Sequence, residues 1–521
     1  MKPPCDQAVI ESSRPAVPCS RAAEPWILAV TILGSSMAFI DSTVVNVALP
    51  AIQKTLGGTV IDMQWVVEGY ALFLSALILT GGAMGDVFGR RRMFLAGATV
   101  FAIASAGCGL AANIQQLVIA RAIQGCGAAF LVPGSLSIIS ASFNEKERGR
   151  AIGTWSGFTS IAAATGPVLG GWLIEHASWR WAFFINVPIA AVVIGFSLWR
   201  VPESKMGAKR SVDWIGALIV TAGLAGVTYG FIESAQLIWN DPSVWGAATF
   251  GGASLIAFVY FEARTHSPMV PLDLFRSSDF TGANLLTLFL YAALGIFFFL
   301  FPLNLIQVQH YSATATGAAA LPFVLLMFLL SRWSGGLVGR LGAKRPLIVG
   351  PVIAAVGFLL FVLPSVGGSY WTTFFPGFVV LGIGMAVSVA PLTTVIMSTA
   401  DQSHAGTASG INNAVARIAG LLAVAILGMV MVSAFSHYLN LRLTQLAIPL
   451  DVMRNIQSNE IRLATLAVPD GLNLNTAATI RMSIDFAFVF GFRVIMLICA
   501  GLSIVSSLFA WRMIGADAKR R

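Results

Sequence analysis

Three charged side chains stand inside otherwise apolar stretches of this sequence: Asp41, Glu68 and Arg121. An ionisable group inside a membrane costs about 2.5–3.5 kcal/mol on insertion scales, so such residues are rarely kept without a use. A buried carboxyl group binds or releases a proton as its surroundings change, because burial favours its neutral form and a nearby cation favours its charged form. These residues therefore predict proton exchange inside a membrane protein.

The two carboxyl groups each have an alternative, structural interpretation. Asp41 is expected near the outer end of the first apolar stretch, where a structural ion pair or a helix-end cap also explains it. Glu68 is expected towards the outer end of the second stretch. It either attracts a cationic substrate, carries a proton, or is a solvated carboxylate at the membrane interface.

Arg121 opens a polar stripe in the fourth apolar stretch. Gln124, Gly125 and Ala128 follow it at helical spacing and therefore share its face. A guanidinium in this place needs a carboxylate, backbone carbonyls or water as a partner. Arg121 either tunes a carboxylate during a transport cycle or makes a fixed bond between helices.

Small residues mark one face of the fifth apolar stretch. Positions 162, 166 and 170 recur every four residues, a pattern that permits close helix approach. A proline in the same stretch removes a backbone hydrogen bond and can bend the helix. The candidate residues are Gly153, Gly166, Pro167, Gly170 and Gly171.

A glycine- and arginine-rich segment, 82–91, follows the second stretch, and a degenerate copy, 335–344, follows the tenth. Two such positions predict two six-helix halves with an inserted helix pair, since eight stretches separate the copies and not six. Repeated halves with a substrate site near the membrane midplane are typical of transporters. The candidate residues of this segment are Gly82, Asp86, Gly89, Arg90 and Arg91, and the family resemblance described below implies a gating role for them.

Charged residues also occur in the second half. Arg332, Arg417 and Arg493 are interpreted as structural. Arg481 and Asp485 have helical i, i+4 spacing near a helix end and are expected to pair with each other.

The composition requires a membrane environment for these elements. Hydrophobic residues make up 57% of the 521 residues, charged residues only 11%, and the mean hydropathy is +0.81. A soluble domain carries about 25% charged residues. A membrane span needs about 20 apolar residues, and stretches of that kind predict an all-α membrane protein with about 14 transmembrane helices. The expected spans are 26–48, 64–84, 93–112, 115–139, 151–173, 181–200, 213–232, 244–261, 279–302, 316–338, 346–364, 372–397, 407–434 and 484–511.

Basic residues predict the orientation of the chain. They gather in the loops after the even-numbered stretches and in the C-terminal tail, and positive residues stay inside. The net charge of +9 therefore encodes topology, and no nucleic acid is expected as a partner. We expect a multi-pass protein of the cytoplasmic (inner) membrane with both termini in the cytoplasm.

The same pattern predicts the domain organisation. A disordered cytoplasmic tail is expected first, then two six-helix halves around a linker with two accessory helices, and an amphipathic extracytoplasmic loop near the end. The expected boundaries are 1–25, 26–200, 201–277, 278–512 and 513–521, with the loop at 436–483.

These motifs together resemble the major facilitator superfamily, and specifically its fourteen-span drug:proton antiporter branch. Segment 82–91 is similar to the superfamily signature, except that Val87 replaces the usual basic residue after Asp86. Segment 40–50 is similar to a motif of the fourteen-span branch, and 121–127 to the motif linked to proton coupling. Segment 153–171 is similar to the antiporter motif, with Ala162 in place of a glycine.

The resemblance implies a major-facilitator fold and proton-coupled efflux of drugs or metabolites by alternating access. The implied partners are protons, the lipid bilayer and a small hydrophobic or cationic substrate, with a periplasmic adaptor as a further possibility for segment 436–483. Proton-coupled carriage of one endogenous metabolite or lipid, or a non-transporting membrane sensor, stays open as an alternative.

Other classes of protein lack support in the sequence. An ATP-driven pump needs a GxxxxGK[ST] loop, which the chain does not contain. A potassium-type channel needs TVGYG, which is also missing. Catalytic motifs and metal-ligand spacings are likewise not found, so we expect no enzyme, no cofactor and no metal.

Overall fold

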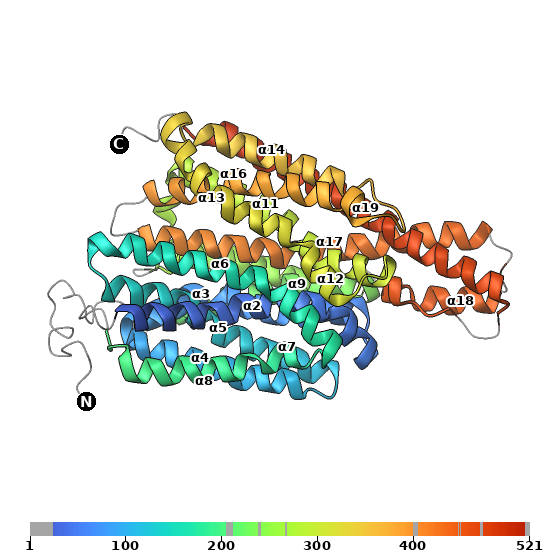
Figure 1. Cartoon of the computed structure of the whole chain (residues 1–521), viewed down its shortest axis with the longest axis horizontal. Coiled ribbons are helices and arrows are strands. Elements are labelled where there is room, and N and C mark those ends of the chain that lie inside the picture. Colours follow the sequence, from blue (N-terminus) through green and yellow to red (C-terminus); the bar gives the residue numbers. More distant parts are fainter. Residues whose placement is uncertain are drawn as a thin grey trace. The chain divides into compact units, whose positions relative to one another are not determined.

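A computed structural model gives the fold of the chain and describes residues 24–204, 212–237, 241–265, 268–399, 405–445, 448, 450–468 and 472–515. The described residues form helices and connecting turns, without a β-strand among them (Figure 1). The predicted tails, 1–25 and 513–521, and the basic part of the linker at 205–211 fall largely outside these ranges. The all-α prediction is confirmed.

The helices of the first part of the chain each begin or end close to a predicted span. They are α2 (Glu24–Leu56), α3 (Val60–Phe88), α4 (Arg90–Leu110), α5 (Ile114–Ser142), α6 (Glu145–His176), α7 (Trp181–Phe184), α8 (Asn186–Arg200), α9 (Trp214–Leu237) and α10 (Pro242–Glu262).

The later helices follow a short 3-10 turn, η1 (Leu272–Arg276). They are α11 (Ser278–Leu303), η2 (Asn304–Val308), α12 (Ala313–Ala319), α13 (Leu321–Leu341), α14 (Lys344–Leu360), α15 (Tyr370–Thr373), α16 (Phe375–Ser398), α17 (Ala405–Gln445), α18 (Leu450–Ser458), η3 (Glu460–Thr465) and α19 (Leu474–Met513).

Side-chain caps explain several helix starts. The side chain of Asn113 accepts a hydrogen bond from the backbone N–H of Gln116 at the start of α5, and Asn144 does the same at α6. Asn473 caps α19 in the same way. Such caps satisfy N–H groups that have no partner inside the helix.

Thirteen helical segments in the described part are long and apolar enough to cross a membrane. The remaining predicted span, 346–364, corresponds to α14, which has 17 residues. Hydrogen-bonded turns continue α14 as far as Leu363, whose N–H donates to Leu360. The described chain therefore has a helical element at every one of the predicted spans.

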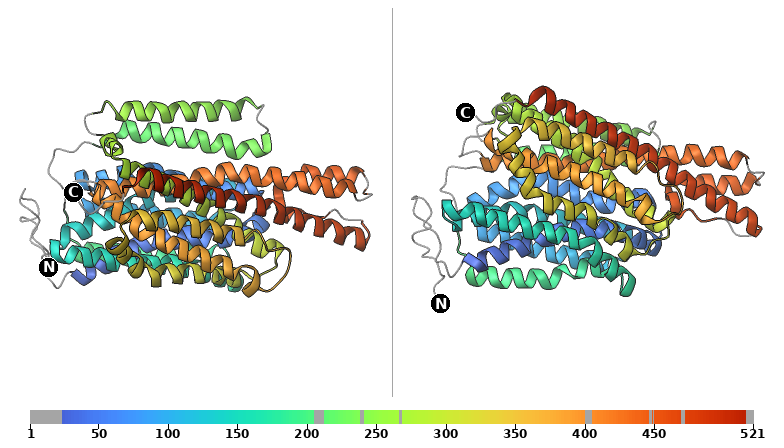
Figure 2. Two further views of the ribbon diagram at one scale, coloured as in Figure 1. Left: turned by 90° about the horizontal axis from the view of Figure 1, so that it is seen from above. Right: turned by 45° about the horizontal axis from the view of Figure 1, so that its top comes forward.

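Much of the predicted extracytoplasmic segment 436–483 is helical, and its position outside the membrane stays a prediction. α17 has 41 residues and continues to Gln445, while α19 has 40 residues and begins at Leu474. Figures 1 and 2 show both helices running side by side to a tip that carries α18. At about 1.5 Å per residue, 41 residues extend about 60 Å, twice the hydrocarbon thickness. The hydropathy of the sequence predicts only the apolar part of each helix and not its polar extension.

The chain divides by contacts into two compact units. The first unit contains the described residues within Met1–Val45, Val66–Ala225 and Gly251–Leu272. The second contains those within Asn46–Trp65, Gly226–Phe250 and Asp273–Arg521. The hairpin of the α2 end and the α3 start thus packs with the later helices, a division that differs from the predicted halves 26–200 and 278–512, which stay a prediction.

Two amide side chains hold this hairpin within the second unit. Gln307 in η2 donates from Nε2 to Oε1 of Gln53 at 3.0 Å. Gln64 donates from Nε2 to the backbone carbonyl of Val424 in α17 at 3.0 Å. All the groups in these two bonds are buried, and none of the side chains carries a charge.

The helix pair α9 and α10 forms an antiparallel hairpin (Figure 2). Two glycines of α9 let the helices approach closely. A Cβ on Gly223 would lie 2.8 Å from Leu255, and one on Gly230 would lie 2.7 Å from the Cβ of Ala248. The predicted inserted pair therefore packs as one local element.

Glycines also set the spacing of α14 and α16 in the second unit. A Cβ on Gly384 would lie 2.5 Å from the backbone nitrogen of Ala354 and 2.8 Å from the carbonyl oxygen of Gly350. Backbone atoms cannot move aside as a flexible side chain can. The close approach of α14 and α16 therefore requires a glycine at position 384.

We expect Gly384→Ala to lower the thermal stability of the purified protein, since overpacking typically costs about 1–3 kcal/mol. The matched control is Gly252→Ala in α10, where a Cβ meets no atom within 4 Å. There alanine is expected to be neutral or stabilising, because it favours a helix by up to about 1 kcal/mol over glycine. Equal unfolding temperatures for the two variants would contradict this account of the packing.

Candidate functional site

Asp41 and Arg121 form an ion pair inside the first unit. Nη1 of Arg121 in α5 lies 2.5 Å from Oδ2 of Asp41 in α2. The side chains are 1% and 0% exposed, respectively. The extension of α2 to Leu56 places Asp41 near the middle of its helix, so the helix-end cap is excluded as an explanation.

Neutral polar groups occupy the second oxygen of Asp41. Nε2 of Gln124 donates to Oδ1 at 2.8 Å, and Nδ2 of Asn186 in α8 donates to the same atom at 3.2 Å. Gln124 also accepts from Nη1 of Arg121 at 2.7 Å. Ser105 in α4 accepts from both amides. Each oxygen of the carboxylate is therefore hydrogen-bonded.

Contacts with α3 hold the Arg121 guanidinium. Its Nε donates to the carbonyl oxygen of Val66 at 3.0 Å. Its Cζ lies 4.2 Å from the centre of the Tyr70 ring, within the range of a cation–π interaction. Tyr70 in turn donates from its hydroxyl to the carbonyl of Ala38 in α2 at 3.3 Å. One guanidinium thus connects α2, α3 and α5.

A buried ion pair of this kind stays stable only while both partners remain. The transfer of two charges from water costs several kcal/mol per ion, and removal of one partner typically costs about 3–5 kcal/mol. Protonation of Asp41 would remove its charge and weaken its attraction for Arg121. The pair and its neighbours therefore connect α2, α3 and α5 through bonds that depend on both charges.

Glu68 is buried in α3 but lies outside the bonds described above. The residue is 1% exposed, and within the described structure its Oε2 is buried without a hydrogen-bond partner. The solvated interfacial interpretation of Glu68 is therefore wrong, because α3 begins at Val60 and places this residue well inside the helix. Glu68 stays a candidate for proton exchange.

The predicted antiporter helix α6 contacts α2 next to Asp41. A Cβ on Gly166 would overlap Oγ1 of Thr43, and one on Gly170 would lie 2.7 Å from Cγ1 of Val44. Gly171 is also buried, and Pro167 lies within the helix. Gly153 differs, since a Cβ there meets no atom within 4 Å. Gly166 and Gly170, and not Gly153, therefore bring α6 close to the turn of α2 that contains Asp41.

The predicted gating segment forms a tight turn between α3 and α4. Arg90 pairs with Asp86 at 2.8 Å and donates from Nη1 to the carbonyl of Ser137 in α5 at 3.2 Å. Gly89 has φ 111, a left-handed conformation that favours glycine. Gly82 has more room, since the nearest atom to a Cβ, on Pro133, is 3.5 Å away.

Glu203 anchors this turn, although sequence analysis did not identify it. Its Oε1 accepts from the backbone N–H of Arg91 at 3.1 Å, and its Oε2 accepts from that of Arg92 at 3.2 Å. Arg91 also donates from Nη1 to the carbonyl of Val201 at 3.0 Å. The residues that follow α8 thus hold the start of α4, where the helix terminus favours a negative charge.

Asn186, Ser105 and Tyr70 were also missed as members of the site. Asn186 lies in an aromatic segment, where a neutral amide gives no signal as clear as a charge. The predicted pair Arg481–Asp485 is confirmed, with Nη2 and Oδ1 3.3 Å apart. The side chains of Arg332 and Arg340 lie outside the described residues.

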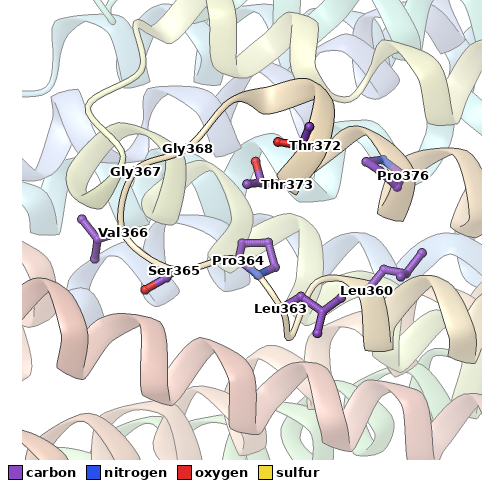
Figure 3. Close-up of a pocket in the computed structure, with 10 residues that line it drawn as sticks. All are labelled: Leu360, Leu363, Pro364, Ser365, Val366, Gly367, Gly368, Thr372, Thr373 and Pro376. Carbon is purple, nitrogen blue, oxygen red and sulfur yellow. The ribbon is translucent and has the colours of Figure 1, made fainter.

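A cavity of about 400 Å³ lies in the second unit, between the end of α14 and the start of α16 (Figure 3). Its lining comes from residues 360–376 and contains no charged side chain. Nearby, the hydroxyl of Tyr370 donates to the carbonyl of Ala319 at 2.7 Å, and burial raises the pKa of this tyrosine to about 12. None of the predicted site residues lines this cavity.

Comparison with known proteins agrees with the fold. Residues 31–424 match the model of the Major Facilitator Superfamily. The chain is 34% identical over 503 residues to the multidrug resistance protein Stp of Mycobacterium tuberculosis, covering 94% of this chain and 92% of that protein. It is 31% identical over 498 residues to a tetracenomycin C resistance and export protein of Streptomyces glaucescens, covering 93% and 91%.

Solved structures support the same fold. A bacterial homologue of the human lysosomal transporter Spinster, in an inward-facing and unoccupied conformation, has a TM-score of 0.63 and 18% identity. The match covers 94% of this chain and 98% of that one. At this identity the likeness supports the fold alone.

We expect Gly89→Ala to destabilise the turn between α3 and α4 by about 1–3 kcal/mol, because alanine is strained at positive φ. A Cβ there would also lie 2.7 Å from Oε1 of Glu203. Gly85→Ala is the control, since its Cβ meets nothing closer than 3.9 Å. Thermal unfolding of the purified variants is the measurement, and an unchanged midpoint for Gly89→Ala would refute the assigned strain.

Proposed function

The chain belongs to the Major Facilitator Superfamily, and from this premise we propose that it exports a small hydrophobic or cationic molecule in exchange for protons. The superfamily consists of transporters, so the chain is a multi-pass membrane transporter and not an enzyme. Relatives named for drug resistance and export favour the outward direction of transport.

The buried pair of Asp41 and Arg121 is the observation that carries this proposal. In the cycle that we propose, a proton neutralises Asp41 and frees Arg121 from its ionic partner. The helices α2, α3 and α5, which these two side chains connect, then rearrange to the alternate conformation. Release of the proton on the other side restores the pair.

Competition between substrate and proton for Asp41 couples the movement of one to the movement of the other. A cationic substrate favours the ionised carboxylate, whereas a proton removes that charge. Substrate and proton therefore exclude each other at the site, which is the requirement for antiport. Gln124 and Asn186, as neutral donors, keep the carboxylate in position in its ionised form.

The available driving force is sufficient for export. One charge moving through a potential of 100 mV supplies about 2.3 kcal/mol. Since about 1.4 kcal/mol is a tenfold change in an equilibrium, one proton supports a gradient of roughly 50-fold for an uncharged substrate. Exchange of one proton for one monovalent cation moves no net charge, so the pH difference alone drives it. A pH difference adds about 1.36 kcal/mol per unit for each proton.

The proposed location is the cytoplasmic (inner) membrane, with both termini in the cytoplasm. The distribution of basic residues in alternate loops supports this orientation. In that orientation the tip that carries α18 faces away from the cytoplasm. A periplasmic adaptor at this tip stays a prediction.

We expect Asp41→Asn to abolish export driven by a proton gradient, because asparagine cannot bind the proton. Uptake of ethidium or tetracenomycin C into everted vesicles is the measurement, with Asp273→Asn, an exposed carboxylate, as the control. Counterflow driven by the substrate gradient alone should persist, which separates lost coupling from lost folding. Undiminished proton-driven transport by Asp41→Asn would refute the role of this residue.

We expect Arg121→Ala to impair coupling, because Asp41 then has no cationic partner to exchange for a proton. Transport by this variant should lose its dependence on an imposed pH difference. Arg276→Ala, which removes an exposed arginine, should retain that dependence. Full exchange activity of Arg121→Ala in proteoliposomes would count against the proposed pair.

A further inference from the structure

Two carboxyl groups face each other where the helix pair α9 and α10 begins and ends. Asp213 directly precedes α9, and Glu262 is the last residue of α10. Both belong to the first compact unit. Neither group takes part in the bonds around Asp41, so they need an explanation of their own.

Each carboxyl group uses one oxygen to bind the backbone. Oδ1 of Asp213 accepts from the N–H of Gly216 at 2.8 Å, which caps the start of α9. Oε2 of Glu262 accepts from the N–H of Val270 at 3.0 Å, which fastens the segment after α10 to the end of that helix. Both side chains are therefore fixed in orientation.

The remaining two oxygens point towards the same place and lack any other partner. Oδ2 of Asp213 and Oε1 of Glu262 are both buried without a hydrogen-bond donor among the described residues. The two groups are within hydrogen-bonding reach of each other. A Cβ on Gly216 would lie 2.5 Å from the first oxygen and 2.8 Å from the second. Glu262 as a whole is 2% exposed.

Charged groups on neighbouring elements are engaged elsewhere. The Arg264 guanidinium lies over the Tyr260 ring, with Cζ 4.1 Å from the ring centre. Asp273 and Arg276 in η1 pair with each other at 3.3 Å and are exposed. From α3, Thr80 brings an uncharged hydroxyl to Met269. In the described structure, none of these cations bonds to the two carboxyl groups.

We propose that Asp213 and Glu262 bind one shared proton and thereby connect the start of α9 to the end of α10. A single proton turns two facing acceptors into a donor and an acceptor, so one O–H···O bond forms and no charge remains unpaired between them. Two ionised carboxylates within hydrogen-bonding reach would repel each other, and removal of water from around them would strengthen the repulsion.

The helix termini assign the proton to Glu262. A negative charge is favourable at the start of a helix and unfavourable at its end. Asp213 lies at the start of α9 and Glu262 at the end of α10, so the carboxylate is Asp213 and the neutral acid is Glu262. Loss of this proton at alkaline pH separates the two groups and loosens the segment that leads to Val270.

This proton-binding site is independent of the proposed export cycle. It requires neither Asp41 nor a substrate, and it concerns the attachment of the inserted helix pair. Its test therefore measures protonation and stability and not transport.

The test compares the full-length wild-type chain with Glu262→Gln in lipid nanodiscs between about pH 5 and about pH 9. Infrared difference spectra should show a protonated-carboxyl band that the wild type loses on alkalinisation and that Glu262→Gln never has. The unfolding temperature of the wild type should fall over the same pH range. It should stay nearly constant for Glu262→Gln, because the amide N–H donates to Asp213 at every pH.

Asp213→Asn gives a second, independent variant in case Glu262→Gln does not fold, and the same loss of pH dependence is expected. Asp273→Asn, which removes an exposed carboxylate of the adjacent turn, should behave as the wild type. Identical infrared and unfolding profiles for the wild type and both site variants would overturn the proposal. So would stabilisation of the wild type by Mg²⁺ at alkaline pH that both variants lose, since the ligand would then be a metal ion.

Discussion

A guanidinium and a carboxylate buried together in the membrane-spanning part of the chain impose the main constraint on this structure. Neither Arg121 nor Asp41 can remain charged there alone, because the cost of an unpaired buried charge exceeds what local packing returns. The surrounding elements supply hydrogen-bond partners to both groups. Gln124 and Asn186 donate hydrogen bonds to the carboxylate of Asp41. The guanidinium donates to the carbonyl of Val66 and lies over the Tyr70 ring.

The spacing of the other helices in the first unit follows from the same need for close approach. α6 contacts α2 through Gly166 and Gly170, one turn from Asp41, because larger residues would push the helices apart. At the turn between α3 and α4, Glu203 and Asp86 neutralise the local arginines. Ion pairs thus connect the elements of the first unit, and glycines allow neighbouring helices to approach closely.

The hairpin of α2 and α3 contrasts with the ionic site. Gln53 and Gln64 connect it to the later helices through hydrogen bonds between uncharged groups. Such bonds contribute only about 0.5–1.5 kcal/mol each, far less than a buried ion pair costs to separate. Contacts of this strength can break and re-form in the alternating-access cycle that we propose.

Sequence analysis could predict the parts of this fold and site that carry an energetic signal. Long apolar runs correctly predicted a helical element at each of the expected spans, and charges inside those runs identified Asp41 and Arg121. Asn186 gave no such signal, because a neutral amide is tolerated in many places, and its distance in sequence from Asp41 concealed the contact. Glu203 lies in a polar connection where a carboxylate is ordinary. The far ends of α17 and α19 were missed because hydropathy does not record a helix that continues beyond its apolar part.

The most direct test of the central claim is proton release when ethidium binds to the purified transporter in weakly buffered solution. If a cation and a proton compete for Asp41, the wild type releases protons on binding, and Asp41→Asn binds ethidium without releasing any. Binding to the wild type without proton release, or the same release from both proteins, would contradict the account.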